Sequence, residues 1–263
     1  MSTRTKNEID GGAGLGCVDA QDSPKSRKER AAVTCDHCNI TEIRKIARRT
    51  VNIIVNHFGS KNICLLGRVG SAASALWADI KRVPNDIDIL VTPNESKQFD
   101  PEEIKRSIVD ADSRYYLRPS KKPGADYKVL FCRLPGFKRK RRRVKVDILI
   151  PLTPRLWIPK VLSEDTWLIN GIPVMPLFDL LVMKMQGWRN HRASRRSDFR
   201  AKVEADVTDI RALLVQARLE GISYGKEYPH HTRGFMARAC RLALGFVEVC
   251  GGQTKFQKLG FPM

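Results

Sequence analysis

The chain has 263 residues, and its 47 Lys and Arg against 28 Asp and Glu give a formal net charge of +19. A hydrophobic fraction of 42% supplies a buried core, which excludes a wholly disordered chain. So large a positive charge favours polyanionic partners such as nucleotides or RNA, and a basic protein with no such partner is the alternative.

The first residues, Met1 to Thr34, are polar, rich in Gly and Ser, and charged towards their end, which predicts disorder. The N-terminus has no apolar core of a signal peptide, and no run approaches the ~18 apolar residues of a membrane span. We therefore expect an intracellular protein of the cytoplasm or nucleus, with no membrane partner. Cys35 and Cys38 have the spacing of half a zinc site, but two reduced thiols are the default interpretation.

Apolar residues at helical spacing predict a helix from Ile40 to Phe58, capped by Asn39 or Thr41. A core strand is expected over 62–69, followed by a short helix over 71–78. The glycine before that helix would let a phosphate approach backbone N–H groups. A tight strand-to-helix turn without a ligand is the alternative.

Three aspartates lie in two strand-like runs, DIDILV and VKVDILI. Because residues i and i+2 of a strand point to the same face, Asp86 and Asp88 should project together. Asp147 occupies the same kind of apolar strand. Carboxylates that converge in this way repel one another unless a cation lies between them, and their oxygens suit Mg²⁺ or Mn²⁺. The pattern favours metal-assisted phosphoryl or nucleotidyl transfer.

These residues resemble the signature of the nucleotidyltransferase fold superfamily, which includes DNA polymerase beta, poly(A) polymerases and small bacterial transferases. The signature reads here as Val69-Gly70-Ser71, then Asp86-Ile87-Asp88, then Asp147. The chain is more similar still to a group of fungal proteins of that superfamily, through GSAA, RVPNDIDI, KVDILIP and the run ending in MQGWRNHR. The resemblance covers roughly Ile40 to Leu214. The spacer before Asp86 is about one residue longer than is usual, so either Gly67 or Gly70 fills the glycine position.

The resemblance implies an α/β (α+β) fold, with a nucleotidyltransferase-type mixed β-sheet flanked by helices and a C-terminal helical extension. It implies that Asp86, Asp88 and Asp147 are catalytic and hold two Mg²⁺ (or Mn²⁺) ions. It also implies that Gly70 and Ser71 bind the triphosphate of an NTP such as ATP, with Lys184 near the nucleotide. The expected division is a disordered segment over 1–34, a catalytic domain over 35–175, a helical part packed on it over 176–250, and a tail over 251–263.

The densest basic run directly precedes the Asp147 strand, where seven of the eight residues from Lys138 to Lys145 are Lys or Arg. Helix 101–109 and strands near 114–117 and 127–134 come before it, so the run should form a hairpin loop. A solvated loop, a nuclear import signal and a clamp for a phosphate-bearing substrate are the three interpretations. The clamp would contact RNA or another polyanion through Lys140, Arg141, Arg142 and Arg143.

The remaining elements are expected as a β-hairpin, then helices. Asn-Gly between two apolar runs predicts the hairpin over 166–174. Lys184 lies in the following helix, where a snorkelling surface lysine is the alternative to a nucleotide contact. Asp206 and Asp209 belong to a long helix, either packed beside the site or bridged i,i+4 on an exposed surface. The ranges are helix 178–188, a basic connector over 188–199, helices 199–219 and 235–250, and a loose tail over 253–263.

Three functions fit these patterns. The first is a metal-dependent nucleotidyltransferase that moves a nucleoside monophosphate from an NTP to an unknown hydroxyl acceptor. The second is a non-catalytic, basic nucleotide- or RNA-binding module on the same fold, and the third treats the acids as unrelated surface residues. Three acids in apolar strands favour the enzyme, because burying them without partners is costly.

Overall fold

The computed structural model describes residues 39–59, 63–64, 71–77, 83–84, 86–92, 100–122, 124–135, 142–151, 157–159, 161–225 and 231–263. The chain divides into two units, Met1–Thr34 and Cys35–Met263, and all described residues belong to the second. The predictions for the N-terminal segment, the Cys35/Cys38 pair, both candidate glycines, and Lys140 and Arg141 lie outside the described residues.

A five-stranded mixed sheet forms the centre of the described chain, in the order β1-β2-β5-β4-β3. Only β2 and β5 run parallel, and the other neighbours are antiparallel. This confirms the predicted mixed sheet. The strands before and after the basic run, β4 and β5, pair antiparallel. The strands are β1 (Ile63–Cys64), β2 (Asp86–Val91), β3 (Tyr115–Pro119), β4 (Lys128–Arg133) and β5 (Arg143–Leu149).

The two faces of the sheet differ in polarity. Strand alternation and register place one apolar set on the same face: Ile87, Ile89, Leu130, Cys132, Val144 and Val146, each at most 1% exposed. Helix α1 (Ile40–Phe58) covers this face, because its Thr50 hydroxyl lies 2.7 Å from the hydroxyl of Tyr115, the register partner of Cys132. Helix α3 (Pro101–Ala111) packs beside α1 and against β3 and β5. The opposite face carries the aspartates.

Helix α1 begins where the sequence predicted. The Asn39 side chain accepts a hydrogen bond of 2.8 Å from the Glu42 backbone N–H, and the Glu42 carboxylate accepts one of 3.0 Å from the Asn39 N–H. This capping box satisfies two N–H groups that a helix leaves without partners. Asn39, rather than Thr41, is therefore the cap.

The predicted Asn-Gly hairpin is present as β6 (Trp167–Ile169) and β7 (Ile172–Val174). Asn170 and Gly171 both have positive φ angles, 52° and 70°. Two consecutive residues with positive φ define the turn whose twist matches that of antiparallel strands. Arg48 of α1 donates a hydrogen bond of 2.6 Å to the Asn170 carbonyl, which ties this hairpin to the helix.

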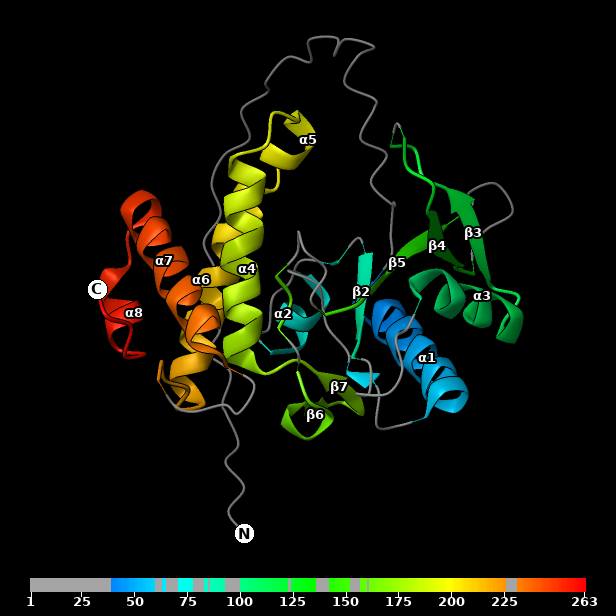
Figure 1. Cartoon of the computed structure of the whole chain (residues 1–263), viewed down its shortest axis with the longest axis horizontal. Coiled ribbons are helices and arrows are strands. Elements are labelled where there is room, and N and C mark those ends of the chain that lie inside the picture. The colour runs from blue at the N-terminus through cyan, green and yellow to red at the C-terminus, as the bar shows by residue number, and fades with distance from the viewer. Residues whose placement is uncertain are drawn as a thin grey trace, which may run out of the picture. The chain divides into compact units, whose positions relative to one another are not determined.

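Helices make up the C-terminal part, and Figure 1 shows α4, α6 and α7 side by side, with α2 between them and the sheet. The basic connector predicted over 188–199 is wrong, because α4 continues through it to Arg192 and α5 follows. None of the described helices is long and apolar enough to cross a membrane. The helices are α2 (Ser71–Trp77), α4 (Leu177–Arg192), α5 (Ser197–Arg200), α6 (Val203–Leu219), α7 (Arg233–Cys250) and α8 (Gln253–Gln257), with a 3₁₀ turn at Ser163–Asp165.

The loose tail expected over 253–263 is also wrong. Phe256, Leu259 and Phe261 are at most 3% exposed, and α8 packs on α6. The Phe261 ring stacks on Phe178 of α4 with 5.8 Å between their centroids. Burying an aromatic side chain is worth about 2–3 kcal/mol, which holds the last residues in the core.

Candidate active site on the acidic face of the sheet

The three aspartates lie on the two parallel strands at the centre of the sheet. Asp88 and Asp147 are direct register partners, and Asp86 is the partner of Lys145. In a parallel pair, partner residues point to the same face, and neighbouring strands are ~4.8 Å apart. All three carboxylates therefore lie on one face, opposite the apolar face beneath α1.

Asp88 is the innermost of the three, with 3% of its surface exposed, whereas Asp86 and Asp147 are half-buried. Position explains the difference between Asp88 and Asp86, because Asp88 lies inside the β2–β5 ladder and Asp86 at its start, whereas Asp147 is level with Asp88. The acidic face thus offers one buried carboxylate flanked by two that solvent or a ligand can reach.

Lys145 is a residue of this face that sequence reasoning missed. Its ammonium forms an ion pair with Asp147 Oδ2, and both side chains are partly exposed. The signal was available, because Lys145 precedes Asp147 by two residues on a strand and must share its face. A positive charge here offsets the repulsion among carboxylates on the same face.

The donor set suits a hard divalent cation, because carboxylate oxygens are what Mg²⁺ and Mn²⁺ prefer. Within the described ranges, however, no group of three or more His, Cys, Asp or Glu side chains is gathered closely enough to hold a metal ion. Asp147 is directed at Lys145 instead. Asp86, Asp88 and Asp147 therefore share one face of the sheet, and their catalytic and metal-binding roles stay predictions.

Helix α2 lies beside the strand that carries Asp86 and Asp88. It begins at Ser71 and packs against β2 as well as α4 and α6. Gly70 lies outside the described residues, so the nucleotide-binding role of Gly70 and Ser71 stays a prediction. Trp77 at the end of α2 donates a hydrogen bond of 3.2 Å to the Met175 carbonyl, which fixes the helix against the segment before α4.

Lys184 is buried between α4 and α6, with 1% of its side chain exposed. Its ammonium lies 2.5 Å from Asp209 Oδ2 and 3.7 Å from Asp206 Oδ1. The snorkelling surface lysine considered as an alternative is therefore wrong, and so is i,i+4 bridging on an exposed helix. His191, which the sequence did not single out, places its Nδ1 2.5 Å from Asp206 Oδ2. The nucleotide-binding role of Lys184 stays a prediction.

Two arginines of the basic hairpin are described, and both are engaged within the fold. Arg142 donates hydrogen bonds of 2.6 Å to the Glu42 carboxylate and 2.8 Å to the Pro135 carbonyl. The Arg143 guanidinium lies over the Phe131 ring, 5.1 Å from its centroid. Arg142 thus links the start of β5 to α1, and a polyanion contact by this hairpin stays a prediction.

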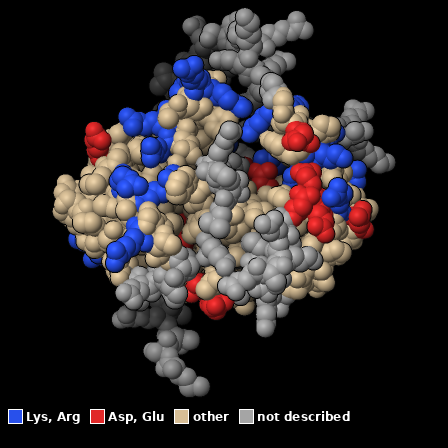
Figure 2. Space-filling model, in the orientation of Figure 1, with Lys and Arg blue, Asp and Glu red and all other residues tan. Residues whose placement is uncertain are grey.

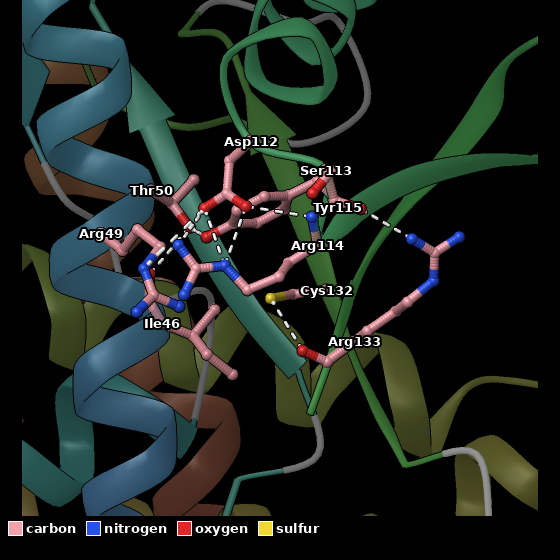
Figure 3. Close-up of polar contacts among 9 residues, drawn as sticks. All are labelled: Ile46, Arg49, Thr50, Asp112, Ser113, Arg114, Tyr115, Cys132 and Arg133. Atoms are coloured by element: carbon pink, nitrogen blue, oxygen red, sulfur yellow. Dashed lines mark hydrogen bonds and ion pairs between the residues drawn. The ribbon is translucent and has the colours of Figure 1, made fainter. Parts of the chain in front are cut away.

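A second polar cluster lies beneath the opposite, apolar face, and Figure 3 shows two arginines directed at the Asp112 carboxylate. Arg114 donates hydrogen bonds of 2.8 and 2.7 Å to it, and Arg49 of α1 lies 3.9 Å away. The hydrogen bond from Arg114 lowers the pKa of Asp112. Burial raises the pKa of Tyr115 and of the Cys132 thiol beside it. This cluster joins α1 to β3 and is structural.

Comparison with known proteins supports the fold and leaves the chemistry open. No protein-family model matches the sequence, and no curated protein matches it. Among solved structures, the chain is similar to the crystal structure of an antigenic nucleotidyltransferase-like protein from Paracoccidioides brasiliensis, at 14% identity and a TM-score of 0.54. The match covers 82% of this chain and 93% of that one. The chain therefore has a nucleotidyltransferase-like fold.

Proposed function

We propose that the protein is a metal-dependent nucleotidyltransferase, which moves a nucleoside monophosphate from an NTP to a hydroxyl acceptor. The observation that carries this proposal is the register of β2 and β5, in which Asp88 and Asp147 are direct partners and Asp86 shares their face. The fold shared with a nucleotidyltransferase-like protein adds support.

In this proposal Asp86, Asp88 and Asp147 hold Mg²⁺ or Mn²⁺ on the acidic face. The bound metal supplies charge neutralisation of the triphosphate and lowers the pKa of an acceptor hydroxyl. In the proposed reaction the buried Asp88 fixes the position of the site, and the more exposed Asp147 accepts a proton from that hydroxyl. Lys145, which forms an ion pair with Asp147, competes with the cation for this carboxylate. The backbone N–H groups that begin α2 bind the triphosphate.

A non-catalytic nucleotide- or RNA-binding module is the second candidate, and a specific observation favours it. Asp147 is already paired with the Lys145 ammonium, and the described residues contain no three-ligand metal cluster. A lysine in that place could serve as a permanent counter-charge in a domain that binds anions without transferring them.

Label transfer separates the two candidates. The purified protein is incubated with each labelled NTP, Mg²⁺ and cell extract, and the labelled product is identified. Asp88→Asn and Asp147→Asn should abolish transfer, because an amide is a neutral and poorer ligand for a hard cation. Asp110→Asn is the matched control, since Asp110 is exposed on α3. Transfer that both site variants retain, or that persists in EDTA, would refute the proposal. NTP binding without any transfer would favour the module.

A further inference from the structure

Trp157 is the most exposed aromatic side chain in the described part of the chain, at 61%. Its φ angle is 49°, in the left-handed region that residues with a side chain seldom adopt. The Arg238 guanidinium from α7 covers one face of the indole, 4.5 Å from the ring centroid. Most of the ring therefore remains open to solvent, while an arginine fixes its orientation.

Arg238 is itself held in place. Its Nε donates a hydrogen bond of 3.1 Å to Gln186 Oε1 of α4, and its Nη2 bonds to the same oxygen. Burial and the nearby positive charges of Arg189 and Arg241 lower the pKa of this guanidinium. Gln186 is neutral, so this hydrogen bond leaves the charge of Arg238 uncompensated.

The three arginines form a positive group without a counter-charge from the described residues. Among the described residues, no Asp or Glu forms an ion pair with Arg189, Arg238 or Arg241. The sequence around them also has more basic than acidic residues, with five Arg and one Asp over 188–200 and three Arg and one Glu in α7. Figure 2 shows Lys and Arg side chains gathered on the visible face over α7, α5 and the adjoining end of α4. Like charges at this density repel unless an anion faces them.

The exposed indole and the uncompensated arginines together restrict the class of ligand that fits this surface. Arginines bind phosphates through planar, forked hydrogen bonds, and a tryptophan offers a surface on which a planar base can stack. A small anion would pair with the arginines but has no planar group to stack on the indole. A duplex keeps its bases stacked inside, where a surface tryptophan does not reach them. Single strands present both phosphates and accessible bases.

We propose that Trp157, Arg238, Arg189 and Arg241 form a binding surface for single-stranded nucleic acid. One base stacks on the open face of Trp157, whose other face rests on Arg238, and the flanking phosphates contact Arg189 and Arg241. Binding here needs neither NTP nor metal, so it goes beyond the proposed transferase activity and is tested separately from it.

The test uses the full-length protein and a fluorescently labelled 20-nucleotide oligo(U) RNA, followed by anisotropy over a range of salt concentrations. Trp157→Ala should weaken binding roughly tenfold, the loss expected for one base–aromatic stack. Trp157→Phe should restore most of that affinity, because it retains a ring. Heparin, a polyanion without bases, should bind Trp157→Ala and the unchanged protein equally. The same oligonucleotide made as DNA shows whether the sugar matters, and binding of either supports the proposal.

The charge contribution has its own variant and control. Arg189→Ser with Arg241→Ser should flatten the salt dependence by a slope of about 1.4, or about 0.7 for each lost phosphate contact. Arg106→Ser with Lys121→Ser removes the same charge from exposed positions on α3 and after β3, and should leave the slope nearly unchanged. Unfolding temperatures verify that all variants fold.

Three results would overturn the proposal. The first is an oligo(U) affinity of Trp157→Ala equal to that of the unchanged protein. The second is a salt slope of the double arginine variant equal to that of its control. The third is binding to vesicles rich in phosphatidylserine that depends on Trp157 while the oligonucleotide does not bind, which would make this a membrane-contacting surface.

Discussion

Lys184 Nζ lies 2.5 Å from Asp209 Oδ2, and each of the two side chains is only 1% exposed. The pair joins α4 to α6, and Asp206 extends it to His191 at the far end of α4. Charges buried to this extent need one another, because removing one from water without a partner costs several kcal/mol. This group therefore fixes how the two helices pack.

Lys184→Met should lower the free energy of unfolding by about 3–5 kcal/mol, because it leaves two carboxylates in the interior without their ammonium. Urea denaturation measures the change. Lys121→Met, at an exposed position, should stay within about 0.5 kcal/mol of the unchanged protein. A loss in Lys184→Met no larger than that of the control would mean that the pair contributes little to packing.

The predicted nucleotide contact of Lys184 can be separated from this structural role. Asp209→Asn disturbs the same ion pair but keeps the ammonium. If Lys184 contacts the triphosphate, Lys184→Met should weaken NTP binding at least tenfold more than Asp209→Asn does, since it removes the positive charge itself. Both are measured well below the unfolding temperature. Equal losses would assign Lys184 to packing alone.

Lys145 should compete with a divalent cation for Asp147, because the ammonium and the cation need the same oxygens. At ~5 Å, a unit charge and a divalent ion repel by about 1.7 kcal/mol even at the dielectric constant of water, which is more than tenfold in affinity. Lys145→Met should therefore bind Mn²⁺ more tightly, as measured by titration calorimetry at low salt. Lys121→Met should bind Mn²⁺ as the unchanged protein does. Weaker binding by Lys145→Met would show that Lys145 helps to build the site.

The features that the sequence predicted well are local ones. The Asn170-Gly171 turn and the Asn39 cap depend on the backbone preferences of a few residues, and strand alternation alone places Asp86 and Asp88 together. The errors are features that depend on tertiary packing. The arginine-rich end of α4 lacks apolar periodicity, and its helix is continued by contacts such as that of Trp188 with Phe246, 5.0 Å between ring centroids.

The predicted loose tail and the surface alternative for Lys184 were wrong for a related reason. Phe256, Leu259 and Phe261 are too sparse to form a periodic pattern, and only the neighbouring helices make them part of the core. The sequence left a surface position open for Lys184 because its partners come from α6, 22 to 25 positions later. Within the site, the pairing of Asp88 with Asp147 depends on a register between strands 59 positions apart, which no local pattern specifies.

Tyr115 should make the protein sensitive to alkaline pH. Burial raises the pKa of its hydroxyl, which lies 2.7 Å from the Thr50 hydroxyl. A raised pKa in the folded state gives stability that is fully present below the unfolded pKa of ~10 and is lost as pH rises through the folded pKa. Tyr115→Phe should lower the free energy of unfolding by about 1 kcal/mol at pH 8. Above pH ~10, the stability of this variant should fall less steeply than that of the unchanged protein. Denaturant unfolding at pH 8 and above pH ~10 measures the difference. Parallel pH curves would contradict the assignment.

Arg142 should matter for stability rather than for ligands. It joins the start of β5 to α1 through Glu42, with each side chain about one-fifth exposed. Arg142→Ser should therefore lower the free energy of unfolding by about 1–2 kcal/mol, a value reduced by partial solvent screening. Glu42→Gln should cost less, because it keeps the helix cap and can still accept a hydrogen bond from Arg142. If Glu42→Gln lowered the free energy of unfolding as much as Arg142→Ser does, the second hydrogen bond of Arg142, to the Pro135 carbonyl, would contribute nothing to stability. That result would contradict this prediction.

The engagement of Arg142 sharpens the prediction for the basic hairpin. If the hairpin contacts a polyanion, Lys140→Ser with Arg141→Ser should weaken RNA binding and flatten its salt dependence by a slope of about 1.4, with little change in NTP binding. Arg142→Ser should leave that slope unchanged, because its guanidinium already bonds to Glu42 and Pro135. Anisotropy with the same oligo(U) RNA measures both variants. A slope that changes with Arg142→Ser as much as with the double variant would show that RNA displaces Glu42. A slope that changes with neither would leave the hairpin as a solvated loop and favour a small acceptor.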